Sequence, residues 1–309
     1  MRALVVGCGS AGRRHISNLL KLGVEVYAYD RDLPLLERTL KEYNIKTYDF
    51  KSRHISLDAF VVCTIPPYHV PFAFESLSHN AHCFIEKPIS HNLDRLDELI
   101  TSYDKAKLTL MVGYQLRFNA GLQEIKRIIE TNELGRLLSI RAEYGNHLKN
   151  WHKGEDYHKL YTGHKNEGGG IILDSSHELD YCMWLVGVPV VEVKSMIGKV
   201  SDLDIDVEDT ADILLKFNNN VVANIHLDMV DKEYKRNCTL VFDKGTIYWT
   251  PYLMVSMSGQ EHKYMQEIDE YLLEMQAFID CIRGKSKPAV DGKCAAETLK
   301  ICLKTLNNT

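Results

Sequence analysis

The tripeptide Glu86-Lys87-Pro88 contains a lysine of the kind that acts on a reacting oxygen. It directly follows the apolar run Cys83-Phe84-Ile85, which predicts a strand that ends at this point. Open α/β sheets bind their ligands at the carboxyl ends of the strands, so Lys87 stands where a substrate is expected. A lysine there can hydrogen-bond the reacting oxygen and, once desolvated, release its proton near neutral pH. The alternative is a surface lysine paired with Glu86.

A second candidate centre follows three consecutive glycines at 168–170. The next residues predict one helix from about 171 to 186, with Asp174 and His177 on a shared face and Asp180 one turn beyond His177. Histidine titrates close to the pH at which most enzymes work, and a neighbouring carboxylate such as Asp180 can orient its ring. The group therefore suits proton transfer. Polar capping of an ordinary helix is the alternative.

A glycine pattern near the N-terminus predicts a dinucleotide site. The stretch Gly7-Cys8-Gly9-Ser10-Ala11-Gly12 has the form G-x-G-x-x-G and lies between an apolar run and a helical pattern. Gly7 allows a tight turn, Gly9 lets the backbone approach a pyrophosphate, and Gly12 lets helix and strand pack closely. Ser10 and Ala11 begin the helix, whose first N–H groups can bind the anion. The alternative is a glycine-rich turn without a ligand.

The residue that ends the next predicted strand bears on the choice of cofactor. Asp30 is placed to accept hydrogen bonds from an adenosine ribose, and its charge repels a 2′-phosphate, which favours NAD. Arg31 follows directly and can reach a 2′-phosphate, so use of NADP stays possible.

Composition limits the kinds of partner. The chain has 309 residues, 45% of them hydrophobic, and this length suits two domains. A net charge of -5 argues against nucleic acid and anionic membranes as general partners. The apolar start is too short for a signal sequence, and no segment approaches the roughly 20 apolar residues of a membrane span. Eight scattered cysteines without a C-x-x-C pair are expected to be reduced and mostly buried. We therefore expect a cytoplasmic protein without structural zinc.

Strand and helix patterns alternate through the first part of the chain. Strands are expected at 57–63, 83–85 and 108–112, and helices at about 69–79 and 92–105. With the glycine-containing unit they predict about six parallel strands. The fold class is therefore α/β, with a doubly wound Rossmann domain over 1–118.

Near residue 118 the pattern changes to alternation with period 2. After a helix at about 120–131, strands are expected at 138–144, 190–199, 209–217, 221–229 and 237–250, the last turned by Asp243-Lys244-Gly245. They predict a large, mostly antiparallel sheet with one buried face. Two helices, at about 267–283 and 292–306, end the chain. We assign 119–309 to an α+β domain that binds substrate and mediates oligomerisation.

The segment from Asn146 to Glu167 is long for a loop in a compact domain, which points to function or to disorder. It carries Trp151 and Tyr161 among lysines and four histidines. Aromatic faces beside hydrogen-bonding groups suit a sugar, and lysines suit a phosphate, nucleotide or carboxylate. The alternative is a solvated loop with balanced charges. The histidines lack the spacing of a zinc site, so no metal is expected.

The motifs in their order resemble the Gfo/Idh/MocA family, the relatives of glucose-fructose oxidoreductase and inositol dehydrogenase. The resemblance rests on the glycine pattern, the Glu-Lys-Pro tripeptide, the segment 113–118 and the triple-glycine helix, and it covers nearly the whole chain. It implies NAD(P)-dependent hydride transfer, with Lys87 and His177 as catalytic residues. Asp174, which lies three residues before the histidine where the family often has four, is implied in catalysis and substrate binding.

The resemblance also implies the remaining contacts. Cofactor contacts are expected from Glu86 and Lys87 and from the segment that contains Thr64, Ile65, Pro66 and His69. This segment departs from the family at Ile65 and His69. Substrate contacts are expected from Arg117, Asp174 and His177, together with Trp151 and Tyr161 of the aromatic segment described above.

These observations favour an oxidoreductase that acts at a carbinol carbon of a sugar, cyclitol or sugar derivative. Two alternatives stay open: a regulator that binds NAD(H) without turnover, and a reductase of a C=C or C=N bond. The open face of the predicted sheet combines apolar and hydrogen-bonding residues, which favours a homodimer or homotetramer.

Overall fold

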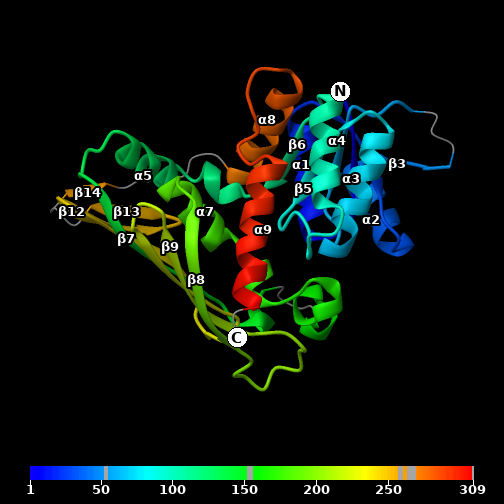
Figure 1. Cartoon of the computed structure of the whole chain (residues 1–309). Helices are drawn as coiled ribbons and strands as arrows, with labels where there is room; N and C mark the ends of the chain where they lie inside the picture. Colours follow the sequence, from blue (N-terminus) through cyan, green and yellow to red (C-terminus); the bar gives the residue numbers. More distant parts are fainter. Residues whose placement is uncertain (52–54, 152–155, 257–259, 263–268, 308–309) are drawn as a thin grey trace. The chain divides into compact units, whose positions relative to one another are not determined.

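The computed structural model describes residues 1–51, 55–151, 156–256, 260–262 and 269–307. They divide into two compact units (Figure 1). The first contains residues 1–115 together with α8 (Glu270–Ile282) and the start of α9 (Gly292–Leu306), up to Glu297. The second begins at Leu116 and takes in the end of α9.

The first unit is built on six parallel strands in the order β3-β2-β1-β4-β5-β6. This order is that of a doubly wound dinucleotide-binding fold, so the predicted Rossmann sheet is confirmed. The strands are β1 (Arg2–Val6), β2 (Glu25–Tyr29), β3 (Lys46–Thr47), β4 (Ala59–Val62), β5 (His82–Glu86) and β6 (Leu110–Gly113). The helices are α1 (Ser10–Lys21), α2 (Leu33–Tyr43), α3 (His69–Ser78) and α4 (Leu96–Ala106).

Helix α8 belongs to the first unit because it packs on α1. The guanidinium carbon of Arg14 lies 4.0 Å from the centre of the Tyr271 ring. The rings of Phe84 and Phe278 are 5.6 Å apart. The predicted division at residue 118 placed both C-terminal helices in the second domain, whereas the structure groups α8 and the first turns of α9 with the first unit.

The second unit is built on an eight-stranded sheet in the order β14-β13-β12-β11-β7-β10-β9-β8. Its neighbours pair antiparallel except for β7 and β10, which are parallel, so the expected mostly antiparallel sheet is confirmed. The strands are β7 (Leu137–Gly145), β8 (Val190–Gly198), β9 (Thr210–Phe217), β10 (Val222–Asp228), β11 (Lys235–Phe242), β12 (Gly245–Thr250), β13 (Leu253–Ser256) and β14 (Gln260–His262).

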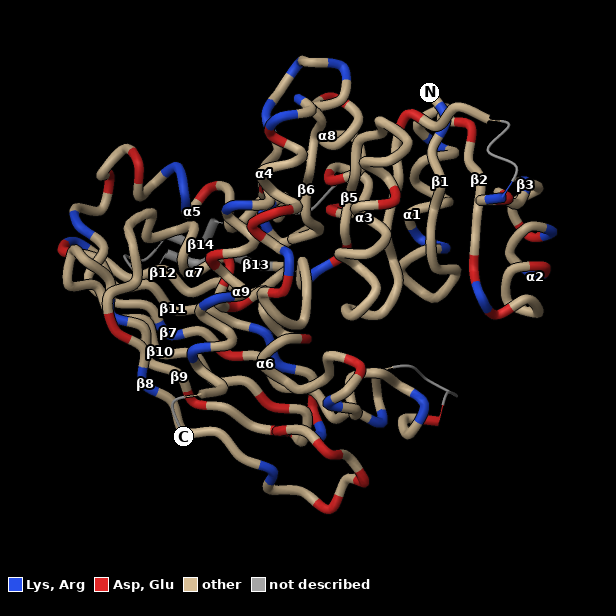
Figure 2. Tube along the Cα trace, turned by 45° about the vertical axis from the view of Figure 1, so that its right-hand side comes forward, with Lys and Arg blue, Asp and Glu red and all other residues tan. Residues whose placement is uncertain are grey.

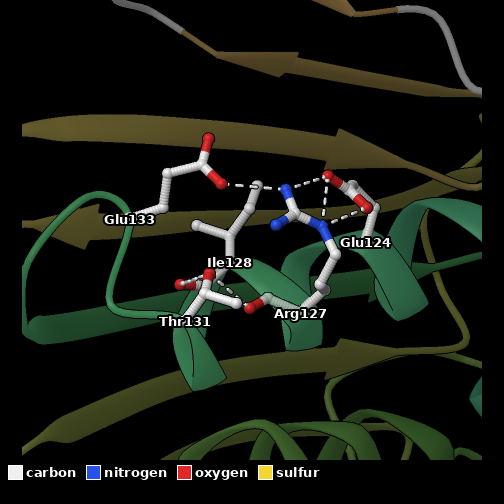
Figure 3. A network of polar contacts seen from close by, with 5 residues as sticks. All are labelled: Glu124, Arg127, Ile128, Thr131 and Glu133. Atoms are coloured by element: carbon white, nitrogen blue, oxygen red, sulfur yellow. Dashed lines mark hydrogen bonds and ion pairs between the residues drawn. The ribbon is translucent and has the colours of Figure 1, made fainter.

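Three helices pack against this sheet: α5 (Ala120–Glu130), α6 (Ile171–Asp174) and α7 (His177–Val186). Asn119 caps α5, since its side-chain oxygen accepts the N–H of Leu122 at 3.1 Å. The same oxygen accepts the indole N–H of the buried Trp249 at 3.0 Å, which ties the helix to β12. On the outer face of α5, Arg127 bridges Glu124 and Glu133 (Figure 3).

Charges of both signs are interleaved along the trace in each unit (Figure 2), with no continuous basic stripe among the described residues. Within the same residues, every helix is too short or too polar to cross a membrane.

All eight cysteines are free, and six of them are buried. Burial raises the pKa of Cys8, which lies inside the glycine pattern, to about 12. Burial likewise raises the pKa of Cys83 and Cys302 to about 12.

A histidine on the outer side of β10 lies between two aspartates. His226 Nδ1 is 2.9 Å from Asp212 and Nε2 is 3.3 Å from Asp228. The pKa of His226 rises to about 9, chiefly because of its hydrogen bond to Asp228, with Asp212 adding to the effect. A folded-state pKa above the unfolded value means that this stabilisation is complete below about pH 6.5 and is lost as the pH rises through 9.

We therefore expect His226→Gln to lower stability at pH 6 and to have little effect above pH 9. The His226 side chain is 38% exposed, and solvent screening limits the difference to about 1 kcal/mol or less. Urea unfolding at pH 6, 7.5 and 9.5 measures it. Asn224→Ala, two residues earlier on the same strand, serves as a control that does not titrate. An equal effect of His226→Gln at all three pH values would contradict the assignment.

Candidate functional site

The glycine turn after β1 brings three backbone segments together. A Cβ atom at residue 12 would lie 1.9 Å from the carbonyl oxygen of Gly7, so only glycine permits this approach of α1 to the turn. Gly7 has φ +96°, and a Cβ there would lie 2.5 Å from the carbonyl oxygen of Cys63. A Cβ at Gly9 would meet nothing within 4 Å. This open space beside the helix N-terminus, at Ser10 and Ala11, fits the pyrophosphate of a dinucleotide.

Asp30 is held in place by the backbone. Its Oδ2 accepts the N–H of Cys8 at 2.6 Å, and its Oδ1 accepts the N–H of Asp32 at 2.8 Å. The first bond links the end of β2 to the glycine turn. Each carboxylate oxygen has a second lone pair, so the predicted contact with a ribose hydroxyl is compatible with this geometry.

Two further predicted cofactor residues, Arg31 and Thr64, follow strands β2 and β4 of the same sheet. The Arg31 guanidinium stacks 5.2 Å above the Tyr68 ring and donates to its hydroxyl at 3.1 Å. Thr64 follows β4, and its Oγ1 is buried without a hydrogen-bond partner among the described residues. An unpaired buried hydroxyl is available to a ligand, which also fits the cofactor. Pro66 begins the 3-10 turn that precedes α3, and Ile65 is the capping residue before it.

The tripeptide that carries Lys87 is anchored on one side by α1. Glu86 Oε1 is 2.6 Å from Nε2 of the fully buried His15. Glu86 Oε2 accepts the backbone N–H of Lys87 at 3.2 Å. Burial raises the pKa of Glu86, but the hydrogen bond and charge of His15 outweigh burial and hold this pKa below its usual value. Sequence reasoning missed His15, although it lies one turn after Gly12.

His69 anchors the other side of the tripeptide. Its Nδ1 is 2.7 Å from the carbonyl oxygen of Pro88, and its Nε2 is 2.8 Å from the carbonyl oxygen of Thr64. The Lys87-Pro88 peptide bond is cis. Burial lowers the pKa of His69, while hydrogen bonds to the two carbonyls act in the opposite direction. Both ring nitrogens thus face the backbone, and the contact of His69 with the cofactor stays a prediction.

In the second unit, the structure corrects the predicted helix at 171–186. Two helices are present: α6 ends at Asp174 and α7 begins at His177, with Ser175 and Ser176 between them. Asp174 and His177 therefore do not share a face of one helix. The apolar periodicity runs through both helices without proline or glycine, which is why the sequence conceals the break.

Asp174 is joined to the aromatic segment that precedes it. The Tyr161 hydroxyl donates a hydrogen bond to Asp174 Oδ1. The triple glycine makes this possible, because a Cβ at Gly169 would lie 2.4 Å from the carbonyl oxygens of Tyr161 and Thr162. Two residues predicted independently to bind substrate are thus brought together.

Trp151 lies in the same segment. Its indole N–H donates to the carbonyl oxygen of Asn146 at 2.8 Å, and its ring centre is 6.2 Å from that of Tyr144. The described part of the predicted loop contains four short 3-10 turns, at Leu148–Asn150, Tyr157–Lys159, Tyr161–Gly163 and Lys165–Glu167. His152, one of its four histidines, lies outside the described residues. The described part of the chain shows no cluster of side chains arranged to hold a metal.

Arg117 and Asp180 form a buried pair that overturns one expectation, the orientation of His177 by Asp180. Arg117 Nε and Nη2 donate to the two oxygens of Asp180 at 2.9 and 2.8 Å. The side chains are only 7% and 1% exposed. Asp180 therefore fixes α7 to the start of the second unit and does not orient His177. Arg117 has this structural role because a guanidinium matches both oxygens of one carboxylate, and its contact with substrate stays a prediction.

A second buried ion pair lies beside His177 in the chain. Glu178 Oε1 is 2.8 Å from Nε of Arg236 on β11, and both side chains are largely buried. The Arg236 guanidinium also lies 4.5 Å from the centre of the Tyr144 ring. Sequence reasoning missed this pair. A signal was present, since the period-2 pattern of β11 puts Arg236 on the same face as the buried Cys238 and Leu240.

Comparison with known families agrees with this geometry. Residues 1–114 match the oxidoreductase family with an NAD-binding Rossmann fold, and residues 122–248 match the GFO/IDH/MocA C-terminal domain. The chain belongs to the GFO/IDH/MocA family of oxidoreductases, and NAD is its cofactor.

Curated relatives match over nearly their whole length. The myo-inositol 2-dehydrogenase of Thermotoga maritima is 25% identical over 325 residues, which cover 95% of this chain and 91% of the relative. The inositol 2-dehydrogenase of Salmonella typhimurium is 23% identical over 329 residues, with coverage of 99% and 94%.

Solved structures share the fold. The WlbA dehydrogenase from Bordetella pertussis, in complex with NADH and UDP-GlcNAcA, has a TM-score of 0.87 at 21% identity and covers 100% of this chain and 95% of its own. The UDP-N-acetylglucosamine 3-dehydrogenase GnnA from Acidithiobacillus ferrooxidans has a TM-score of 0.85 at 20% identity, with coverage of 100% and 97%.

The position of Asp30 leads to a prediction about cofactor preference. Asp30→Asn removes the charge that repels a 2′-phosphate but keeps one acceptor for the backbone. We expect the ratio of NADP to NAD affinity to rise roughly tenfold, equivalent to about 1.4 kcal/mol. Titration of both cofactors by intrinsic fluorescence measures the two Kd values. Glu25→Gln, at the other end of β2, is the matched control, and an unchanged ratio in Asp30→Asn would count against Asp30 as the selecting residue.

Proposed function

We propose that this oxidoreductase transfers hydride between NAD and a carbinol carbon of a sugar, cyclitol or sugar derivative, a class that includes phosphorylated and nucleotide-linked sugars. The observation that carries this proposal is the anchored Lys87, whose two neighbours in the tripeptide are both fixed by buried histidines. Relatives named for inositol and for UDP-N-acetylglucosamine support the class of substrate. NADP stays an additional possibility because Arg31 adjoins Asp30.

His177 is the proposed base. As the alcohol is oxidised, its imidazole takes the hydroxyl proton, the C–H bond gives up a hydride, and a C=O bond forms. Lys87 stabilises the negative charge that develops on the oxygen by donating a hydrogen bond to it. The bound nicotinamide supplies the acceptor for the hydride. Gly7, Gly9, Gly12 and Asp30 hold the cofactor's pyrophosphate and ribose.

Tyr161 and Asp174 form the proposed anchor for other hydroxyls of the substrate. The aspartate accepts from the tyrosine and keeps lone pairs for a second donor. Trp151 offers an aromatic face in the same segment. Among the alternatives, a regulator that binds NAD(H) without turnover would have no need of this set, and a C=C or C=N reductase would have no use for an alkoxide stabiliser.

Substitution of the two catalytic residues tests the mechanism. Lys87→Met and His177→Asn should each lower kcat by about 10² to 10⁴, because general acid–base groups contribute this much. NAD affinity should change little, since neither side chain is assigned to the pyrophosphate or ribose. Absorbance at 340 nm with a panel of cyclitols, sugars and sugar nucleotides measures turnover.

Lys107→Met is the control, because Lys107 is exposed and belongs to no part of the proposed site. Near-normal turnover in both catalytic variants would exclude the mechanism. Tight NAD binding without turnover across the whole panel would favour the regulator.

The outer face of the second unit's sheet is the proposed oligomer interface. Large apolar side chains are exposed there: Met196 is 81% exposed, Leu214 44% and Val222 39%. They alternate with groups able to hydrogen-bond, such as Asp212 and Asn224, as in many subunit interfaces. We therefore expect a homodimer, or a tetramer built from dimers. A cytoplasmic location stays a prediction from the sequence.

Charge on this face should dissociate the oligomer. We expect the unmodified protein to give a multiple of 35.4 kDa by light scattering at micromolar concentration, and Val222→Glu to give the mass of one chain. Leu33→Glu, which changes an apolar residue that is 63% exposed on α2, should leave the mass unchanged. A mass near 35.4 kDa for the unmodified protein would exclude the interface.

A further inference from the structure

His69 contacts the backbone at two functional loops at once. Strands β4 and β5 are parallel neighbours, with Val62 opposite Ile85, so the loops that follow them leave the same edge of the sheet. The ring of His69 joins these loops, since Nε2 reaches the carbonyl oxygen of Thr64 and Nδ1 that of Pro88. The first loop belongs to the predicted cofactor site and the second carries Lys87.

Burial and the start of helix α3 restrict the movement of the His69 ring that joins the two loops. His69 is 1% exposed and begins α3, so its ring is held by a regular element of the fold. Contacts of 2.7 and 2.8 Å are full hydrogen-bond distances. A carbonyl oxygen only accepts, so the ring must donate through N–H, and the neutral imidazole that burial favours has one N–H, which can donate to either carbonyl group.

Lys87 is thus supported through its two neighbours. His15 contacts Glu86 from α1, and His69 contacts Pro88 from α3. With the residues before and after it fixed, the backbone of Lys87 has little freedom, and its side chain has a defined origin. A catalytic group needs such support, because small displacements of a reacting group cost large factors in rate.

We propose that His69 is a positioning residue for Lys87, which it holds at a fixed distance from the cofactor loop by bridging the carbonyl groups of Thr64 and Pro88. This proposal rests on the proposed function, in which Lys87 acts on the substrate oxygen. It predicts that what matters at position 69 is N–H donation to these carbonyl groups, and not an aromatic ring that fills space.

Two substitutions separate these roles. His69→Phe keeps a planar ring of similar size and removes N–H donation. His69→Gln brings an amide with two N–H donors and no charge, so it can restore the bridge. The matched control is His79→Phe at the other end of α3: its side chain is 7% exposed and contacts Glu75, not the tripeptide.

We expect His69→Phe to lower kcat by roughly 10-fold to 100-fold with little change in the Kd for NAD. His69→Gln should recover most of the loss, and His79→Phe should retain full kcat. Thermal unfolding of all three variants identifies any general loss of structure. A fall in kcat that His79→Phe shares, or that His69→Gln fails to relieve, would overturn the proposal.

A second measurement does not depend on turnover. The acetylation rate of Lys87 by acetic anhydride, followed by peptide mass spectrometry, reports the surroundings of its amine. We expect this rate to change severalfold in His69→Phe and to stay unchanged at Lys107. An unchanged rate at Lys87 would overturn the positioning role. If Lys87→Met retains turnover while His69→Phe still alters the labelling, the catalytic role of Lys87 fails and the structural link stands.

Discussion

The absence of a side chain at residue 12 is the constraint on which the rest of the first unit depends. It lets α1 approach the turn after β1 within a distance that any Cβ would prevent. One turn further along the helix, His15 then reaches Glu86, whose other oxygen holds the N–H of Lys87. The helix end proposed to bind phosphate and the support of Lys87, the proposed catalytic lysine, thus share a single close contact between backbones.

Much of the fold could be predicted because its signals are local. The glycine pattern, the alternation of strands and helices, and the period-2 strands after residue 118 each arise within a few neighbouring residues. The grouping of α8 with the first unit could not be found in this way, since it depends on contacts such as that of Arg14 with Tyr271, far apart in the chain. The break between α6 and α7 was concealed because two serines interrupt the helix without changing its apolar pattern.

The residues of the candidate site also separate into those that local sequence predicts and those that depend on distant contacts. Residue types and order were enough to select Lys87, His177, Asp174 and Tyr161, and the structure joins the last two. Partners were harder to predict. Asp180 had a histidine three residues away as an obvious partner, yet it binds Arg117, which is 63 positions distant and offers two parallel donors. The roles of His15 and His69 were hidden for a related reason: each is defined by what its ring touches on another element.

The buried thiols have a consequence for the chemistry of the cofactor loop. Cys8 lies between two of the glycines, and the turn also contacts the backbone of Cys63. Only a thiolate reacts readily with peroxide or alkylating agents, and burial raises the pKa of both thiols far above the pH of a cell. The two thiols at this turn are therefore held in a form that oxidants and alkylating agents attack slowly.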